Sequence, residues 1–377
     1  MNKDKLKIDI ECDFWEYLTQ AGKPVLMYGM GNGADKILAV CGEKSIEVSD
    51  FFASDGFVRG HSFHGKRVLS YSEACEKYGK GSFIVLLSFA SSLPEVLENI
   101  RKISAECEFY APDVPVSGKG IFDLGYFRKY EGRFENAYSM LADDESKRIF
   151  RNVIYYKLTG KTEYLFDSES NTDEIFLSGN ILHPSEYRVA ADLGAYNGDT
   201  VRELAEYAPG LESVIALEPD RRSFSKLESY AETEKRFSVL PFHCAAWSCS
   251  ETLLFDGSGN RNANALSGTS APAASGARGK VTEVNAEPLD RIFESTGLER
   301  LDYIKYDVEG SEAEALCGAE GVIRRFKPEM LVSLYHRNED MFALPEAIHN
   351  LCPEYKMYLR RFRYIPAWDL NLYCIKN

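Results

Sequence analysis

The sequence predicts an α/β protein of two domains, each built on a mostly parallel sheet that helices cover. The chain has 377 residues, of which 45% are hydrophobic, and a single core stops growing at roughly 250 to 300 residues. Short apolar runs alternate with helix-like segments in both halves, which is typical of parallel sheets. Between them, from about residue 119 to 185, a charged and mainly helical pattern indicates a connector.

The composition of the chain limits which partners the protein can bind and in which cellular compartment we expect it. The formal net charge is −14, whereas nucleic-acid binders need clustered Lys and Arg. The nine cysteines are odd in number and form no C-x-x-C pair, which favours reduced thiols. The N-terminus lacks the apolar core of a signal peptide, and no run approaches the roughly 18 to 20 apolar residues of a membrane span. We therefore expect a cytoplasmic protein without nucleic-acid partners, and a homo-oligomer stays open.

The first domain, expected over residues 1–118, begins with a strand, a glycine turn and a helix. Its predicted elements are strands at Pro24–Tyr28, Ser45–Val48 and Ser82–Ser88 and a helix at Pro94–Ile103. The turn carries Gly29, Gly31 and Gly33, which is one residue shorter than the G-x-G-x-x-G of dinucleotide sites. Asp50 lies near the position expected for a ribose-binding acid. Nucleotide or nucleotide-sugar binding and a structural or acceptor-presenting role both remain open.

The last domain, expected over residues 186–377, contains a second α/β series. Its predicted strands are Val189–Leu193, Ser213–Leu217, Phe237–Phe242, Leu301–Asp307, Met330–Leu334, Tyr355–Arg361 and Asn371–Ile375. Residues 256–280 are rich in Gly, Ala, Ser and Asn without an apolar period, which predicts a loop. That loop is either a surface excursion or a lid over the site.

A glycine turn after the first of these strands is the strongest motif. The strand ends in Asp192-Leu193-Gly194 and continues through Gly198 and Thr200 into a helix. A turn without a Cβ atom lets a ligand approach the carboxyl end of the strand, where open α/β sheets bind ligands. The pattern differs from that of a pyrophosphate site. It suits the zwitterionic methionine end of S-adenosylmethionine, whose ammonium group an acid can meet.

A carboxylate closes the next strand. Glu218 lies in Glu218-Pro219-Asp220, twenty-four positions after Gly194, and an acid at about this offset binds ribose hydroxyls in nucleotide folds. The alternative is a turn glycine and a helix-capping acid that happen to fall here.

The segment from Ile304 to Glu312 brings charge to the end of another strand. Because strand side chains alternate, Lys305, Asp307 and Glu309 point to one side. Burying charges is costly unless they are paired or bind something. An active-site role is preferred to the alternative of an internal salt bridge between Lys305 and Asp307.

His336 follows the next strand and is a candidate general base for removing a hydroxyl proton. Asp307 is the substitute, and Lys305 completes the candidate catalytic set. Asp307 and Glu309, with His336 and Glu339, could instead hold Mg²⁺, but nothing in their spacing demands a metal.

Together these motifs resemble the FkbM family of S-adenosylmethionine-dependent methyltransferases over about residues 186 to 377. The diagnostic stretch, I-K-x-D-V-E-G-x-E, stands at residues 304 to 312. The resemblance implies a class I methyltransferase fold, a Rossmann-like sheet of seven strands whose last strand is antiparallel. It also implies O-methylation, often of sugars or natural products, and makes Ala245 and Trp247 neighbours of the adenine pocket. The first domain is similar to the Rossmann-like units attached to some sugar-modifying enzymes.

The sequence thus predicts an S-adenosylmethionine-dependent methyltransferase that acts on a sugar, glycan or natural-product hydroxyl. The expected cofactor-binding residues are Asp192, Gly194, Tyr196, Asn197, Gly198, Thr200, Glu218, Pro219, Ala245, Trp247 and Asp307. One alternative is a non-catalytic nucleotide- or sugar-nucleotide-binding protein that retains the fold. Another is an NAD-dependent oxidoreductase that uses the first glycine turn.

Overall fold

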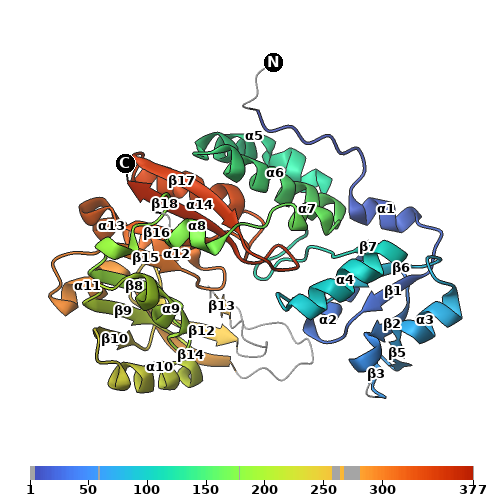
Figure 1. The fold of residues 1–377 in the computed structure, drawn as a ribbon, viewed down its shortest axis with the longest axis horizontal. Helices are drawn as coiled ribbons and strands as arrows, with labels where there is room; N and C mark the ends of the chain where they lie inside the picture. The colour runs from blue at the N-terminus through green and yellow to red at the C-terminus, as the bar shows by residue number, and fades with distance from the viewer. Residues whose placement is uncertain (1–4, 58–59, 178, 257–263, 267–280, 377) are drawn as a thin grey trace.

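A five-stranded parallel sheet forms the N-terminal part in the order β5-β2-β1-β6-β7 (Figure 1). The computed structural model describes residues 5–57, 60–177, 179–256, 264–266 and 281–376. The strands are β1 (Val25–Tyr28), β2 (Val48–Ala53), β5 (Leu69–Ser70), β6 (Ile84–Leu87) and β7 (Glu108–Tyr110). Around them lie α1 (Phe14–Gln20), α2 (Asn32–Glu43), α3 (Tyr71–Tyr78), α4 (Pro94–Glu106), a 3-10 turn (Asp55–Phe57) and the hairpin of β3 (Ser62–Phe63) and β4 (Lys66–Arg67). β1 and β6 are buried along their whole length, which explains their uninterrupted apolar runs.

The prediction for the second strand was wrong. It begins at Val48, where the predicted strand ended, and runs to Ala53. Asp50, which was expected to follow the strand near the ribose-binding position, lies inside the strand and is buried. Its carboxylate accepts hydrogen bonds from Lys77 Nζ at 2.6 Å and the Tyr78 hydroxyl at 2.5 Å, so partners from α3 satisfy the charge. Asp50 is therefore not at the ligand-binding end of β2.

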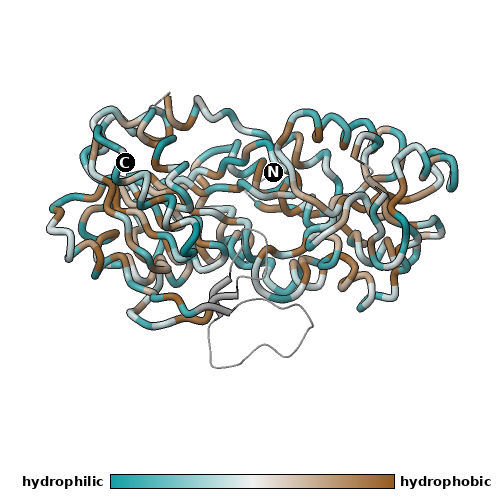
Figure 2. Tube along the Cα trace, turned by 90° about the horizontal axis from the view of Figure 1, so that it is seen from below, coloured by the Kyte–Doolittle hydropathy of each residue, from teal (hydrophilic) through white to brown (hydrophobic). Residues whose placement is uncertain are grey.

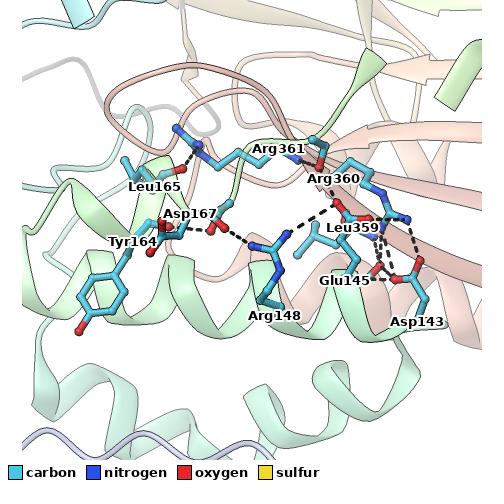
Figure 3. A network of polar contacts seen from close by, with 12 residues as sticks. Asp143, Glu145, Arg148, Tyr164, Leu165, Asp167, Leu359, Arg360 and Arg361 are labelled. Atoms are coloured by element: carbon cyan, nitrogen blue, oxygen red, sulfur yellow. Dashed lines mark hydrogen bonds and ion pairs between the residues drawn. The ribbon is translucent and has the colours of Figure 1, made fainter. Parts of the chain in front are cut away.

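The central helices pack on the C-terminal part. They are α5 (Leu124–Met140), α6 (Asp144–Thr159), α7 (Glu163–Phe166) and α8 (Thr172–Phe176). Helix α5 packs against helix α14 (Asp340–Leu351), and α6 packs against strand β17 (Tyr355–Arg361). The ring of Phe134 on α5 lies 4.9 Å from that of Phe342. At the start of α6, Asp143 caps the helix through Ser146 N–H and pairs with buried Arg360 at 2.6 Å; Figure 3 shows this network.

The C-terminal sheet has seven strands in the order β10-β9-β8-β15-β16-β18-β17. They are β8 (Val189–Leu193), β9 (Ser213–Leu217), β10 (Ser238–Phe242), β15 (Tyr303–Tyr306), β16 (Glu329–Ser333), β17 (Tyr355–Arg361) and β18 (Leu370–Lys376). The helices are α9 (Asp199–Tyr207), α10 (Arg221–Thr233), α11 (Leu289–Thr296), α12 (Glu312–Cys317), α13 (Glu320–Phe326) and α14 (Asp340–Leu351), with a 3-10 turn at Pro184–Glu186. β18 is antiparallel to both its neighbours, and the other pairs are parallel. This confirms the expected class I methyltransferase sheet, preceded by a Rossmann-like unit.

A small sheet of β11 (Ala245–Ala246), β12 (Glu251–Asp256), β13 (Asn264–Leu266) and β14 (Val281–Glu287) lies beside the large one. Residues 256–280 were expected to form a loop, but residues 264–266 pair with β12 in antiparallel register. The prediction was wrong there because strand pairing supplies order that the local composition lacks. The rest of that segment, and the lid interpretation with it, lies outside the described residues.

Both parts share one hydrophobic core. A single buried cluster contains Phe83 of the N-terminal sheet, Phe150 of α6 and Ile304 of the C-terminal sheet. In Figure 2, hydrophobic segments run through both halves of the molecule. Among the described residues, none of the helices has the length and apolar character needed to cross a membrane.

Candidate active site

The glycine bend after β8 is closed tightly against two neighbouring strands. Gly194 has φ +86°, and a Cβ atom there would lie 2.0 Å from the carbonyl oxygen of Asp307. Its N–H donates to Leu217 O of β9 at 3.0 Å. Gly198, also left-handed, caps α9 without a side-chain hydrogen bond. Only glycine fits position 194, because both the backbone angle and the contact with Asp307 exclude a side chain.

Glu218 meets this bend directly. The Tyr196 N–H donates to Glu218 Oε2 at 2.8 Å, and the Asp220 N–H donates to Oε1 at 2.7 Å. Only 7% of the residue is exposed, and burial raises its pKa to about 7 although both backbone bonds oppose the rise. Each oxygen keeps a lone pair that can accept from a further donor. The bend and the acid therefore lie side by side, as the sequence motif predicts.

Lys305 links the ends of β8 and β15. Its Nζ lies 3.4 Å from Asp192 Oδ1 and 3.4 Å from Asp307 Oδ2. Asp192 also accepts the Thr200 hydroxyl. Burial alone would lower the pKa of Lys305, but Asp192 and Asp307 outweigh it and keep the pKa above its ordinary value. The predicted salt bridge exists, with one cation shared between two acids.

Asp307 has partners on both carboxylate oxygens. The hydroxyls of Ser333 and Tyr335 each donate to Oδ1 at 3.1 Å, while Oδ2 faces Lys305. Burial would raise the pKa of Asp307, but Lys305, His336 and the two hydroxyls hold it below its ordinary value. Neither Ser333 nor Tyr335 was among the predicted site residues; their alternate positions at the end of β16 were the available indication.

His336 is fully buried among carboxylates. Its Nδ1 lies 2.8 Å from Glu312 Oε1, and its Nε2 lies 3.5 Å from Glu309 Oε2 and 3.6 Å from Asp307 Oδ1. Burial lowers the pKa of His336, but the three acids outweigh it and raise the pKa to about 10. An imidazole with this pKa is protonated at neutral pH, so the geometry favours a fixed cation over the general base considered from sequence.

A metal site at His336 is the alternative to an ion-paired imidazolium. Within the described residues, Asp307, Glu312 and His336 are close enough to be considered as metal ligands. Glu312 faces Nδ1 of the imidazole and Asp307 faces Nε2, so the acids lie against different nitrogens, as in an ion-paired imidazolium. Glu339 is exposed at the start of α14. The arrangement gives no support to Mg²⁺.

A cavity of about 830 Å³ opens beside these charges. Asp192, Lys305 and Asp307 form part of its wall, and Ser92 of the N-terminal part and Arg363 of the β17–β18 connection also line it. The cavity therefore connects the ends of the methyltransferase strands with the N-terminal half.

The remaining candidates are spread out. Ala245 and Trp247 pack in a separate apolar cluster with residues of β12 and β14, and the indole N–H donates to Glu251 at 2.5 Å. Asn197 Oδ1 accepts from Arg202 at 3.0 Å. The Pro219 carbonyl is 3.1 Å from His243 Nε2. His243, an aromatic group next to Glu218-Pro219, was not singled out from the sequence.

The first glycine turn has a packing explanation. A Cβ atom at Gly33 would lie 2.1 Å from the Ser88 carbonyl oxygen, and one at Gly29 would lie 2.5 Å from the Phe89 ring. These two glycines let the turn approach the end of β6, with or without a ligand.

The comparisons with known proteins agree with this geometry. The family model described as Methyltransferase FkbM domain matches residues 192–366. The crystal structure of the methyltransferase FkbM from Methylobacillus flagellatus KT has a TM-score of 0.69 and 21% identity, over 94% of this chain and 90% of that chain. Aeropyrum pernix fibrillarin with natively bound S-adenosyl-L-methionine has a TM-score of 0.33 and 12% identity, over 53% and 71%. A search among curated proteins found no similar sequence. Residues 192–366 of this chain form a methyltransferase domain of the FkbM family.

Proposed function

We propose that the C-terminal domain binds S-adenosylmethionine and transfers its methyl group to a hydroxyl of a small-molecule or carbohydrate acceptor. The observation that carries the proposal is the contact between the glycine bend and Glu218 through the Tyr196 N–H. This contact joins the glycine bend, which suits the amino-acid end of the cofactor, to Glu218, which suits its ribose.

The residues present fit this cofactor. Glu218 is buried, carries a raised pKa and retains acceptor capacity for two hydroxyl donors. Asp192 offers an acid to the zwitterionic end, and the first turn of α9, which has no side-chain cap at Gly198, offers backbone N–H groups. The cofactor supplies an electrophilic methyl group on a sulfonium sulfur. The chain has to position the acceptor oxygen and remove its proton.

The cavity supports a hydroxylated acceptor. Its wall contains the charged side chains of Asp192, Lys305 and Asp307. Aromatic side chains, among them Tyr303, Tyr335 and Tyr373, line it as well. Aromatic faces cover apolar ring surfaces, and carboxylates accept hydrogen bonds from hydroxyl groups. Such a wall suits a sugar or a related polyol.

We also propose that the chain consists of three parts with different roles, which are residues 1–118, 119–185 and 186–377. Ser92 reaches the cavity wall, which favours an acceptor-presenting role for the N-terminal part over a separate nucleotide site. All nine cysteines are free thiols, which fits a reducing compartment such as the cytoplasm.

Calorimetric titration with S-adenosylmethionine tests the cofactor assignment. Wild-type protein is expected to bind, and Glu218→Ala to bind about a hundredfold more weakly, because two hydrogen bonds to a charged acceptor are lost. Glu228→Ala, which removes an exposed acid of α10, serves as the matched control and should bind like the wild type. Equal affinity of Glu218→Ala and wild type would refute the ribose assignment, and no binding by the wild type would refute the function.

The acceptor is found by incubating the protein with methyl-labelled cofactor and a panel of sugars, nucleotide sugars and glycolipids. Label is expected in a hydroxylated member of the panel. Binding of the cofactor without transfer to any member would favour the non-catalytic alternative.

A further inference from the structure

The acids that line the cavity outnumber the cations. Among the described residues, its wall contains two cations, Lys305 and Arg363, and five acids, which are Glu169, Asp192, Glu203, Asp307 and Asp369. Lys305 lies 3.4 Å from each of Asp192 and Asp307. Arg363 Nε donates to Glu169 Oε2 at 3.1 Å. Both cations of the wall are therefore engaged by other acids, and neither of them neutralises Glu203 or Asp369.

These two acids act on one another at the cavity. Glu203 is an exposed residue of α9, whereas Asp369 is half-buried in the β17–β18 connection. Burial raises the pKa of Asp369, and the charges of Asp307 and Glu203 add to the rise. The Asn371 amide, which donates to Asp369 Oδ1 at 2.8 Å, and the Arg361 guanidinium oppose it. Because the two carboxylates repel each other, a cation bound between them would be stabilised by both.

The charges of both acids also reach a buried tyrosine of the cavity wall. Tyr373 of β18 is 0% exposed and lines the cavity. Burial raises the pKa of Tyr373, and Asp369 and Glu203 add to the rise. Its hydroxyl makes no hydrogen bond of normal geometry with the described residues. Buried polar groups are nearly always paired, so an unpaired one in a cavity wall indicates a partner that is still to bind.

We propose that the acceptor carries an ammonium group besides its reactive hydroxyl, and that Glu203 and Asp369 bind this ammonium in the cavity. The inference rests on the proposed function and narrows its acceptor to hydroxylated amines such as amino sugars. A primary ammonium has three donors, so both carboxylates and one further acceptor can share it. The protonated nitrogen has no lone pair to receive a methyl group, so the hydroxyl remains the reacting group.

The strand order separates this ammonium site from the proposed cofactor site. Glu218 directly follows β9, and Asp369 directly precedes β18. Strands β8, β15 and β16 lie between these two, which corresponds to about 19 Å at the usual spacing of strands. The sulfonium sulfur of S-adenosylmethionine is one methylene group from the ribose, and its ammonium group is assigned to Asp192. Under the proposed function, the charges of the cofactor therefore lie far from Asp369.

Calorimetric titration with hydroxylated amines tests the site without turnover. The probes are glucosamine, galactosamine and trans-2-aminocyclohexanol, and each is compared with its neutral counterpart, which is glucose, galactose or cyclohexanol. The protein is saturated with S-adenosylhomocysteine, which has no methyl group to transfer. At least one amine is expected to bind the wild type about tenfold or more tightly than its counterpart, because hydrogen bonds between charged groups are gained. No preference for any of the amines would overturn the proposal.

A double variant, Glu203→Gln with Asp369→Asn, removes both charges with little change in volume. Asparagine tolerates the φ of +60° at position 369. The preference for amines is expected to fall below about twofold in this variant, while its affinity for S-adenosylmethionine stays within about twofold of wild type because the two sites are distant. The matched control is Glu206→Gln, an exposed acid of the same helix, which should keep the full preference.

A preference for amines that persists in the double variant would overturn the assignment to these two acids. A tenfold or larger loss of S-adenosylmethionine affinity in the double variant, an estimate of about 1.4 kcal/mol, would show that the acids serve the cofactor, and would overturn the proposal as well. Failure of the wild type to bind S-adenosylmethionine would instead refute the proposed function. Titration of the amines into the cofactor-free protein would then still decide whether the cavity binds an ammonium group.

Discussion

The carboxylates at the ends of adjacent strands in this site have different pKa values because their surroundings differ. Glu218 is buried and Glu309 is half-buried, and desolvation raises the pKa of each to about 7. Asp307, beside Lys305, has a lowered pKa. Acids whose environments separate their pKa values can serve different functions at one pH. The raised pKa of Glu218 and the lowered pKa of Asp307 therefore suit different roles in the proposed reaction.

The pH dependence of cofactor binding follows from Glu218. Its ionised form accepts hydroxyl hydrogen bonds, so protonation as the pH falls through about 7 removes the acceptor. Affinity for S-adenosylmethionine is expected to be about tenfold lower at pH 6 than at pH 8. Calorimetry at several pH values measures this. Glu218→Gln should bind weakly and without that slope; a slope that persists in the variant would trace it to another group.

A buried ion pair joins the start of helix α6 to strand β17. Arg360, 2% exposed, reaches Asp143 at 2.6 Å and Glu145 at 3.5 Å. Removing one partner of a buried pair leaves an uncompensated charge. The pair therefore makes the connector helix and the sheet edge dependent on each other.

Arg360→Met is expected to lower the free energy of unfolding by about 3 to 5 kcal/mol. Adding Asp143→Asn should restore part of the loss, because asparagine still caps α6 while the unpaired charge disappears. Denaturant unfolding measures both variants. Arg324→Met, at an exposed pair, is the control and should cost at most about 1 kcal/mol; an equally small loss in Arg360→Met would contradict the assignment.

The whole molecule is held together by contacts between its halves. Ser91 and Ile365 exchange two backbone hydrogen bonds at 2.9 and 3.0 Å, and the Ser117 N–H donates to the His336 carbonyl at 2.9 Å. The hydrophobic core is also continuous across both sheets. The N-terminal part is thus packed into the same unit as the methyltransferase domain.

Thermal unfolding is accordingly expected to occur in one cooperative transition that both halves share. Differential scanning calorimetry measures it, with the emission of variants that keep Trp15 alone, in the N-terminal half, or Trp247 alone, in the C-terminal half, as local probes. Two separated transitions would show that the halves unfold independently.

Local sequence predicted most strands and the meeting of Gly194 with Glu218, because buried parallel strands and glycine turns have local patterns. Sequence analysis failed where a partner far away along the chain determines the position or the charge of a residue. Asp50 lies inside β2 because α3 supplies Lys77 and Tyr78. His336 was placed correctly after β16, but its charge depends on Glu309 and Glu312 from another turn. No spacing rule along the chain contains that information.

The wall of the cavity is formed by residues that lie far apart in the sequence. Ser92 comes from the first third of the chain and Arg363 from its end, whereas Asp192 and Lys305 lie in between. Under the proposed function, mutations in the two outer stretches would change which compound is accepted, while the middle stretch would keep its site for the methyl donor.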